Sequence, residues 1–184
     1  MSIAHFDDVS TQLISTGTWL YQQAFEATTG WTILGNDTAN LTTDVAHVIG
    51  AKSLEFDKVD GDANTVFAGV YRTVDWDLSS VHPTDHLIAG INVDTADVTY
   101  ALVRLGTSAS HYTEWRYPDT GLGDSLWSME SVLIGEPSAQ VGNGVLWNNI
   151  DYLVVAVAFD AAGDTVADIF WNYIGIQRSL LTRT

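Results

Sequence analysis

Carboxylates are the most abundant side chains in this chain that could do chemistry. It holds 23 acidic residues, 18 of them Asp and five Glu. Glycoside cleavage needs two carboxyl groups at a defined separation, with the pKa of one raised by burial. Glu114 could pair in this way with Glu130, Asp119 or Asp124. With so many acids some pair looks suitable by accident, so the pattern does not predict a glycosidase.

A second possible kind of catalytic site would use histidine. Only His82 and His86 are close in sequence, in the stretch HPTDH, and Pro83 argues against a helix that would place them on one face. A small hydrolase or cupin-like enzyme would need both to converge with an acid. The sequence has no Gly-x-Ser-x-Gly motif, no phosphate-binding glycine loop, no dinucleotide fingerprint and no cysteine. We therefore expect a protein that is not an enzyme and requires no cofactor.

Aromatic residues favour binding over catalysis. Trp115, Tyr117 and Trp127 flank the turn Pro118–Asp124. An exposed aromatic ring packs against the C–H face of a pyranose, while nearby oxygens bond its hydroxyl groups. Aromatic residues also dominate protein–protein interfaces, so the same rings could serve a protein partner. The predicted ligand-binding residues are Trp115, Tyr117, Trp127, Glu114, Asp119 and Asp124.

The charge balance argues against several kinds of partner. The net charge of −16 disfavours a nucleic-acid binder, whose affinity comes from cations on phosphates. It disfavours an anionic membrane surface for the same reason. No run of 18 apolar residues occurs, so we expect no transmembrane helix. The opening MSIAHFDDVS lacks a basic segment followed by a long apolar stretch, so we expect no secretory signal.

A two-residue hydrophobic period runs through most of the chain and predicts strands. The expected strands cover residues 18–26, 53–59, 65–76, 85–94, 98–105, 111–117, 126–134, 150–160 and 166–177. Residues 53–59 and 65–76 look like a hairpin. Turn signals separate the strands without crossover helices, so we expect an all-β antiparallel β-sandwich. It is predicted to span residues 18–178, between an N-terminal arm, 1–17, and a C-terminal tail, 179–184.

Two of the expected strands are apolar on both faces. Residues 151–160 place Val154 and Ala156 on one side and Val155 and Val157 on the other, and 166–177 behaves similarly. A sandwich strand normally has one wet face, so the second face must be covered. The cover could be the N-terminal segment, a long loop or a neighbouring subunit.

Two stretches carry a family resemblance, VTYALVRLGTSASHYTEWRY at 98–117 and the paired strands at 147–159 and 166–176. Together with KSLEF at 52–56 they resemble the jelly-roll modules of the galactose-binding-like or carbohydrate-binding class found in tailed-virus structural proteins. The resemblance implies a jelly-roll fold that binds a sugar or another protein without catalysis. Many such modules hold a structural calcium ion; Glu26 matches the early acidic position, whereas Asn172 stands at the late one and offers a neutral oxygen in place of a carboxylate, which weakens a calcium site.

These observations predict a virion structural protein at the surface of a bacteriophage particle. The main hypothesis is a capsid decoration or cement protein that binds neighbouring capsid subunits and forms a homo-oligomer, with a trimer suited to a capsid axis. The alternative is a carbohydrate-binding module, or a tail or fibre adhesin that recognises host-surface glycans. A glycan partner is compatible with either role, whereas nucleic acid and membrane are not expected.

Overall fold

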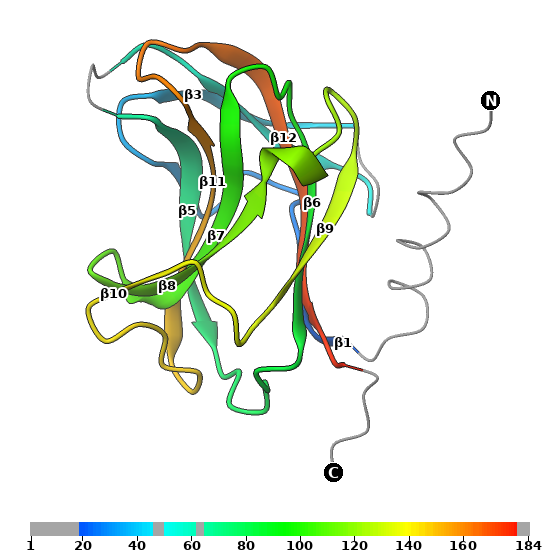
Figure 1. Ribbon diagram of the computed structural model, residues 1–184, viewed down its shortest axis with the longest axis vertical. Helices are drawn as coiled ribbons and strands as arrows, with labels where there is room; N and C mark the ends of the chain where they lie inside the picture. Colours follow the sequence, from blue (N-terminus) through cyan, green and yellow to red (C-terminus); the bar gives the residue numbers. More distant parts are fainter. Residues whose placement is uncertain (1–18, 46–49, 62–64, 180–184) are drawn as a thin grey trace, which may run out of the picture.

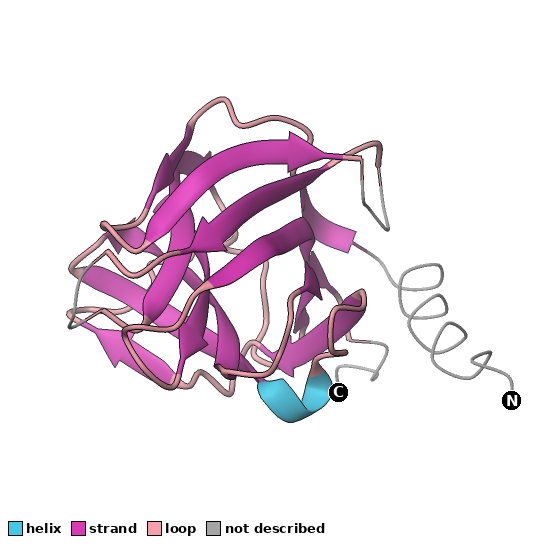
Figure 2. Cartoon of the chain, turned by 90° about the horizontal axis from the view of Figure 1, so that it is seen from above, coloured by secondary structure: helices cyan, strands magenta, loops and turns pink. Residues whose placement is uncertain are grey.

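The chain folds into two antiparallel β-sheets packed face to face (Figures 1 and 2). The computed structural model describes residues 19–45, 50–61 and 65–179. This arrangement confirms the predicted all-β sandwich. The predicted arm at 1–17, and residues 180–184 of the predicted tail, lie outside the described residues. Within the described ranges, no helix has the length and apolar character needed to cross a bilayer.

The first sheet is built around β12. In spatial order it contains β3 (Thr38–Asp44), β4 (Ser53–Lys58), β12 (Val166–Gln177), β6 (His86–Asn92) and β9 (Ser128–Leu133), and β1 (Trp19–Ala24) also pairs with β12. The first half of β12 pairs with β4 and the second half with β1, while β6 pairs along the other edge.

The second sheet is built around β11 and β7. In spatial order it contains β10 (Ala139–Val141), β8 (His111–Pro118), β7 (Val98–Ser108), β11 (Ile150–Phe159), β5 (Phe67–Trp76) and β2 (Trp31–Ile33). A single 3₁₀ turn, η1 (Asp119–Gly121), follows β8 and is the cyan element in Figure 2.

The core fills the space between the two sheets. Leu54 and Phe56 of β4 enter it from one side, and Val155 and Val157 of β11 enter it from the other. Each of these side chains is fully buried. Burying such a side chain stabilises the fold by about 1.5–3 kcal/mol relative to leaving it in water. The alternation of β4 and the apolar composition of β11 therefore follow from their places in the sandwich.

A register irregularity in β12 explains why both of its faces looked apolar in sequence. It falls between Trp171 and Tyr173. Ile169 and Trp171 face the core before it, and Ile174 and Ile176 face the core after it. The irregularity switches which set of alternate residues is buried, because each side of a strand repeats every two residues.

The second face of β11 is covered within the sheet itself. Val154 and Ala156 form a small second apolar cluster with Leu102 of β7. Larger side chains of the same sheet, including Tyr71 and Tyr152, pack over this cluster. The cover expected from the sequence is thus intramolecular for β11, and it comes from neighbouring strands.

Each of the nine predicted strands coincides with an observed one, but the pairing of two of them differs from the prediction. Residues 53–59 and 65–76 do not form a hairpin, because β4 belongs to the first sheet and β5 to the second. The sequence also missed the strands β2, β3 and β10, which lie at sheet edges.

Candidate functional site

The outer surface of the second sheet carries rings and charges that do not belong to the core. Alternate residues of β5, β7, β8 and β11 point away from the first sheet, because their neighbours in sequence enter the core. We call this surface the aromatic face. It consists of Phe67, Tyr71, Tyr100, Arg104, Tyr112, Glu114, Arg116 and Tyr152, over a floor of Gly69, Leu102, Val154 and Ala156.

Two pairs of aromatic rings lie on this surface. The ring centroids of Tyr71 and Tyr152 are 5.9 Å apart, and those of Phe67 and Tyr100 are 6.4 Å apart. All four side chains are half-buried, so part of each ring meets solvent. Rings held on strands by neighbouring side chains lose little further freedom when a ligand packs on them.

A buried carboxylate holds two arginines beside these rings. Both Glu114 oxygens accept a hydrogen bond, Oε2 from Nε of Arg104 at 2.7 Å and Oε1 from Nε of Arg116 at 2.6 Å. The Glu114 side chain is only 3% exposed, whereas those of Arg104 and Arg116 are 15% and 39% exposed. Charge-assisted bonds of this kind fix the orientation of both guanidinium groups.

The guanidinium groups also stack on the rings of the aromatic face. The Arg104 guanidinium carbon lies 4.8 Å from the ring centroid of Tyr112 and 5.4 Å from that of Phe67. The Arg116 guanidinium carbon lies 4.2 Å from the ring centroid of Tyr100. Cation–π contacts at these distances join the rings of Phe67, Tyr100 and Tyr112 to the two arginines.

Small residues in the floor let the strands beneath this layer pack closely. Gly69 of β5 is paired with Ala156 of β11, which is paired with Leu102 of β7. A Cβ atom at Gly69 would lie 2.3 Å from the Cβ of Ala156 and 2.6 Å from the Val155 carbonyl oxygen. This position therefore requires glycine.

Two tyrosines of the aromatic face, Tyr100 and Tyr152, keep their protons at neutral pH. Burial raises the pKa of Tyr100 and that of Tyr152. Each hydroxyl therefore stays neutral and can both donate and accept a hydrogen bond.

The structure buries two members of the ligand-binding set predicted from the sequence. Trp115 is 1% exposed and Tyr117 is fully buried, so the expectation that they form an exposed platform is wrong. Nε1 of Trp115 donates to the Ile134 carbonyl oxygen, and the Tyr117 hydroxyl donates to the Leu87 carbonyl oxygen. Both residues alternate with Glu114 and Arg116 along β8, and this set faces the core.

Three other members of that set lie in the segment between β8 and β9. Asp119 begins η1 and is exposed. Asp124 is exposed, and its Oδ1 accepts the Thr95 amide at 3.4 Å. Trp127 is half-buried, with its ring centroid 6.2 Å from that of Phe170 on β12. Of the six predicted residues, only Glu114 lies on the aromatic face.

The structure places the members of two catalytic alternatives, Glu114 with Glu130 and His82 with His86, among separate partners. Glu114 is on the outer surface of the second sheet, whereas Glu130 belongs to β9 of the first sheet. Nδ1 of His82 bonds Oγ1 of Thr84, and Nδ1 of His86 bonds Oγ of Ser131. The two imidazoles are thus held by separate local partners and do not form a group with an acid among residues 19–45, 50–61 and 65–179.

Glu26 and Asn172, the two residues considered for calcium, approach the same stretch of backbone. Both oxygens of Glu26 accept the Ala51 amide, at 2.9 and 3.1 Å, and Nδ2 of Asn172 donates to the Lys52 carbonyl oxygen at 2.9 Å. Calcium takes six to eight oxygen ligands. These direct hydrogen bonds tie Glu26, which follows β1, and Asn172 of β12 to the segment before β4. Calcium at Glu26 and Asn172 stays a prediction.

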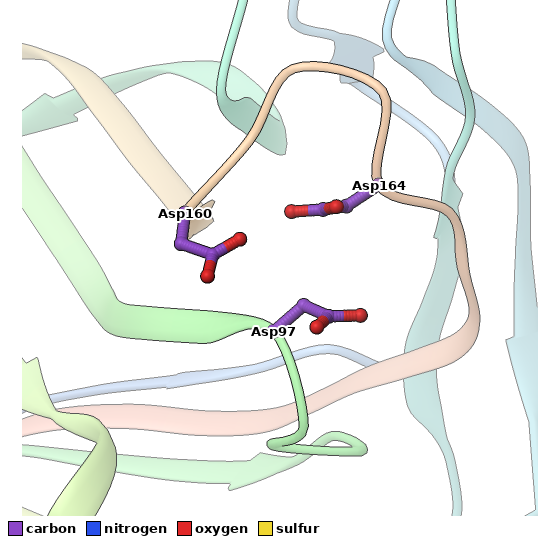
Figure 3. A group of neighbouring side chains, drawn as sticks. All are labelled: Asp97, Asp160 and Asp164. Carbon is purple, nitrogen blue, oxygen red and sulfur yellow. The ribbon is translucent and has the colours of Figure 1, made fainter.

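A different set of oxygens could receive a cation. Asp97, Asp160 and Asp164 place carboxylate oxygens within 4.8 Å of one another, between the loop that precedes β7 and the loop that follows β11 (Figure 3). The hydrogen bond from Asp164 and its negative charge raise the pKa of Asp160. This cluster was not expected from the sequence, where its only signal is the short turn DAAGD at 160–164.

Comparison with known proteins identifies the architecture. No protein-family model and no curated protein matches the sequence. An exo-β-agarase structure matches 89% of this chain with a TM-score of 0.60 and 10% identity. The family 11 carbohydrate-binding module from Clostridium thermocellum, in complex with a β-1,3-1,4-mixed-linked tetrasaccharide, matches 84% of this chain and 92% of its own, with a TM-score of 0.58 and 13% identity. The fold is the jelly roll of carbohydrate-binding modules.

The structural similarity extends to another binding module but covers only part of the agarase. A carbohydrate-binding module specific for non-crystalline cellulose, CBM28, matches 82% of this chain and 89% of its own, with a TM-score of 0.50 and 11% identity. By contrast, the chain spans about a quarter of the exo-β-agarase. At these identities the similarity shows the fold, whereas function must be argued from the site itself.

Proposed function

We propose that this protein is a carbohydrate-binding β-sandwich that holds a glycan on the aromatic face and acts by binding without catalysis. The observation that carries the proposal is the layer formed by two ring pairs and the Arg104–Glu114–Arg116 cluster on the outer side of the second sheet. It is supported by a jelly-roll fold shared with carbohydrate-binding modules.

The chemistry of this layer suits a sugar. The C–H face of a pyranose packs on an aromatic ring, which removes apolar area from water, and Tyr71, Tyr152 and Tyr100 offer such rings together with hydroxyl groups. The guanidinium groups of Arg104 and Arg116 add hydrogen-bond donors in fixed positions. Because the layer is held by contacts within the protein, little ordering is needed when a glycan binds.

The names of the structural neighbours are consistent with this proposal. The family 11 module was solved with a mixed-linked tetrasaccharide, and CBM28 is described as specific for non-crystalline cellulose. For this chain, the virion decoration role, the capsid partner, the trimer and the virion location expected from the sequence stay predictions.

Binding to polysaccharides in affinity gels, followed by isothermal titration with oligosaccharides, tests the proposal. Truncation of a central aromatic contact typically costs 2 kcal/mol or more, so Tyr71→Ala and Tyr152→Ala should each weaken binding by about 30-fold. Trp127→Ala is a matched control, because Trp127 is a half-buried aromatic residue outside the aromatic face. Trp147→Ala is a second control, since Trp147 lines a cavity of about 290 Å³ at one end of the sandwich.

The variants separate the candidate surfaces. Loss of binding in the two tyrosine variants, with both tryptophan variants unchanged, would support the aromatic face as the site. Loss of binding in Trp127→Ala or Trp147→Ala alone would place the site elsewhere. Failure of the unmodified protein to bind any neutral or charged glycan would refute the proposed function.

A further inference from the structure

Two arginines stand side by side on the aromatic face with part of each guanidinium group unused. Arg104 and Arg116 each give only their Nε–H to Glu114. In the described part of the chain, the Nη atoms of these two residues have no hydrogen-bond partner. Each Nη edge is therefore available for an acceptor, and Arg116 is the more exposed of the two.

The same surface offers few acceptors to a neutral sugar. Glu114 is the only carboxylate of the aromatic face, and both of its oxygens already accept hydrogen bonds from arginine. Its side chain is 3% exposed, so a ligand does not reach it. Tyrosine hydroxyls can accept, but the charged groups that remain on this face are donors only. A ligand rich in acceptors complements this arrangement better than one rich in hydroxyl donors.

The local charge differs in sign from the charge of the whole protein. Two arginines and one glutamate leave the aromatic face with one net positive charge, in a chain whose net charge is −16. Arg104 and Arg116 are two of only seven basic residues. Their placement beside exposed rings, joined by one carboxylate that orients both, is what a site for planar anionic groups requires.

We propose that the glycan bound by the aromatic face is anionic, with a uronate carboxylate or a sulfate ester against the Nη edges of Arg104 and Arg116. This inference rests on the proposed function and specifies its substrate class. The oxygens of either group accept two parallel hydrogen bonds from a guanidinium, while the sugar ring packs on the neighbouring tyrosines. Carboxylate and sulfate share this chemistry, and the ligands chosen below distinguish them.

The negative charge of the rest of the protein affects how binding of an anionic glycan depends on salt concentration. At low ionic strength the net charge of −16 repels a polyanion over long distances. In about 0.5 M NaCl the screening length falls to about 4 Å, which suppresses that repulsion more than a direct guanidinium contact. Binding is therefore best measured in 0.5 M NaCl.

Polymers of the same backbone with and without their anionic groups provide the test. De-esterified polygalacturonate is compared with highly methyl-esterified pectin, and sulfated carrageenan with its desulfated form, in affinity gels and by titration in 0.5 M NaCl. We expect at least one charged polymer to bind about tenfold more tightly than its neutral counterpart, because hydrogen bonds to charged groups are stronger than neutral ones. The pair that shows the difference identifies the carboxylate or the sulfate.

Variants assign the difference to the arginines. Arg116→Gln should weaken binding of the charged polymer about tenfold and change binding of the neutral one less than threefold, while Arg116→Lys should fall between. Arg104→Gln gives a second readout, and a thermal melt checks that each variant is folded. Arg72→Gln is the matched control, because it removes the same charge from a residue whose guanidinium lies 6.0 Å from the Trp31 ring, away from the aromatic face.

Different results would refute the anionic ligand and the proposed function. Equal binding of charged and neutral polymers, with Arg116→Gln behaving like Arg72→Gln, would overturn the anionic ligand and leave the proposed function standing. Loss of charged-polymer binding in Arg72→Gln equal to that in Arg116→Gln would assign the effect to overall charge and overturn the inference as well. Absence of binding to every polymer would refute both proposals.

Discussion

A buried ion pair connects three separate segments of the sandwich, and its removal has a calculable cost. Lys58 and Asp37 lie 2.7 Å apart from Nζ to Oδ2, and both side chains are fully buried. Nζ of Lys58 also donates to the Val59 carbonyl oxygen at 2.9 Å and to the Ala162 carbonyl oxygen at 2.7 Å. Lys58 thereby ties the end of β4 to the loop before β3 and to the loop that follows β11.

Lys58→Met should destabilise the protein by about 3–5 kcal/mol. Removing one partner leaves the Asp37 carboxylate buried without its counter-charge, which accounts for most of this cost. The carbonyl oxygens of Val59 and Ala162 also lose a donor. Domains of this kind are stable by about 5–15 kcal/mol, so a loss of this size is a large fraction of the total free energy of unfolding.

Urea unfolding followed by tryptophan fluorescence measures the effect, and Asp37→Ala completes a double-mutant cycle. The Asp37→Ala/Lys58→Met variant has no unpaired charge, so it should be less unstable than the two single losses added together, by about 2 kcal/mol or more. A cost below about 1 kcal/mol for Lys58→Met, or strictly additive losses, would refute the view that this pair is buried and mutually compensating.

Three further predictions follow from single contacts. Burial raises the pKa of Glu130, so the stability linked to its protonation is present at low pH and is lost as pH rises through the raised pKa. Glu130→Gln should therefore stabilise the protein at pH 7 by less than about 1 kcal/mol in thermal melts, and this gain should vanish near pH 4. Gly69→Ala should destabilise by about 1–3 kcal/mol in urea because its Cβ would overlap β11, whereas Gly163→Ala, with no atom within 4 Å, should be neutral. Trp115→Phe should cost about 1–3 kcal/mol in the same assay because it removes the bond to Ile134 and part of the contact with Trp147, and an unchanged midpoint would contradict the buried position of that ring.

The positions of the long strands were predictable because their signal is local. Alternation and β-branched or aromatic content give strands at β5, β7, β8, β11 and β12, close to where the structure has them. The three missed strands, β2, β3 and β10, are short or largely polar. They form because an edge of a sheet is available for pairing, and that information lies in the neighbouring strand.

The residues of the candidate site could not be predicted from the two-residue alternation of β8, because alternation does not tell which side of a strand faces the core. In β8 a two-residue period separates Thr113, Trp115 and Tyr117 from Glu114 and Arg116, but either set could have faced outward. From the sequence, Trp115, Tyr117 and Glu114 were all expected in one binding site, whereas the structure turns Trp115 and Tyr117 into the core and Glu114 and Arg116 to the opposite face.

Composition and local periodicity by themselves determined that this chain forms strands, has no cysteine chemistry and carries a strongly acidic surface. Only the tertiary structure decided that β4 and β5 lie in opposite sheets, and that Arg104 of β7 meets Glu114 of β8. The reason is physical. Which face of a strand is buried, and which side chains become neighbours, depends on the sheet that packs against it and on the register of the adjacent strand.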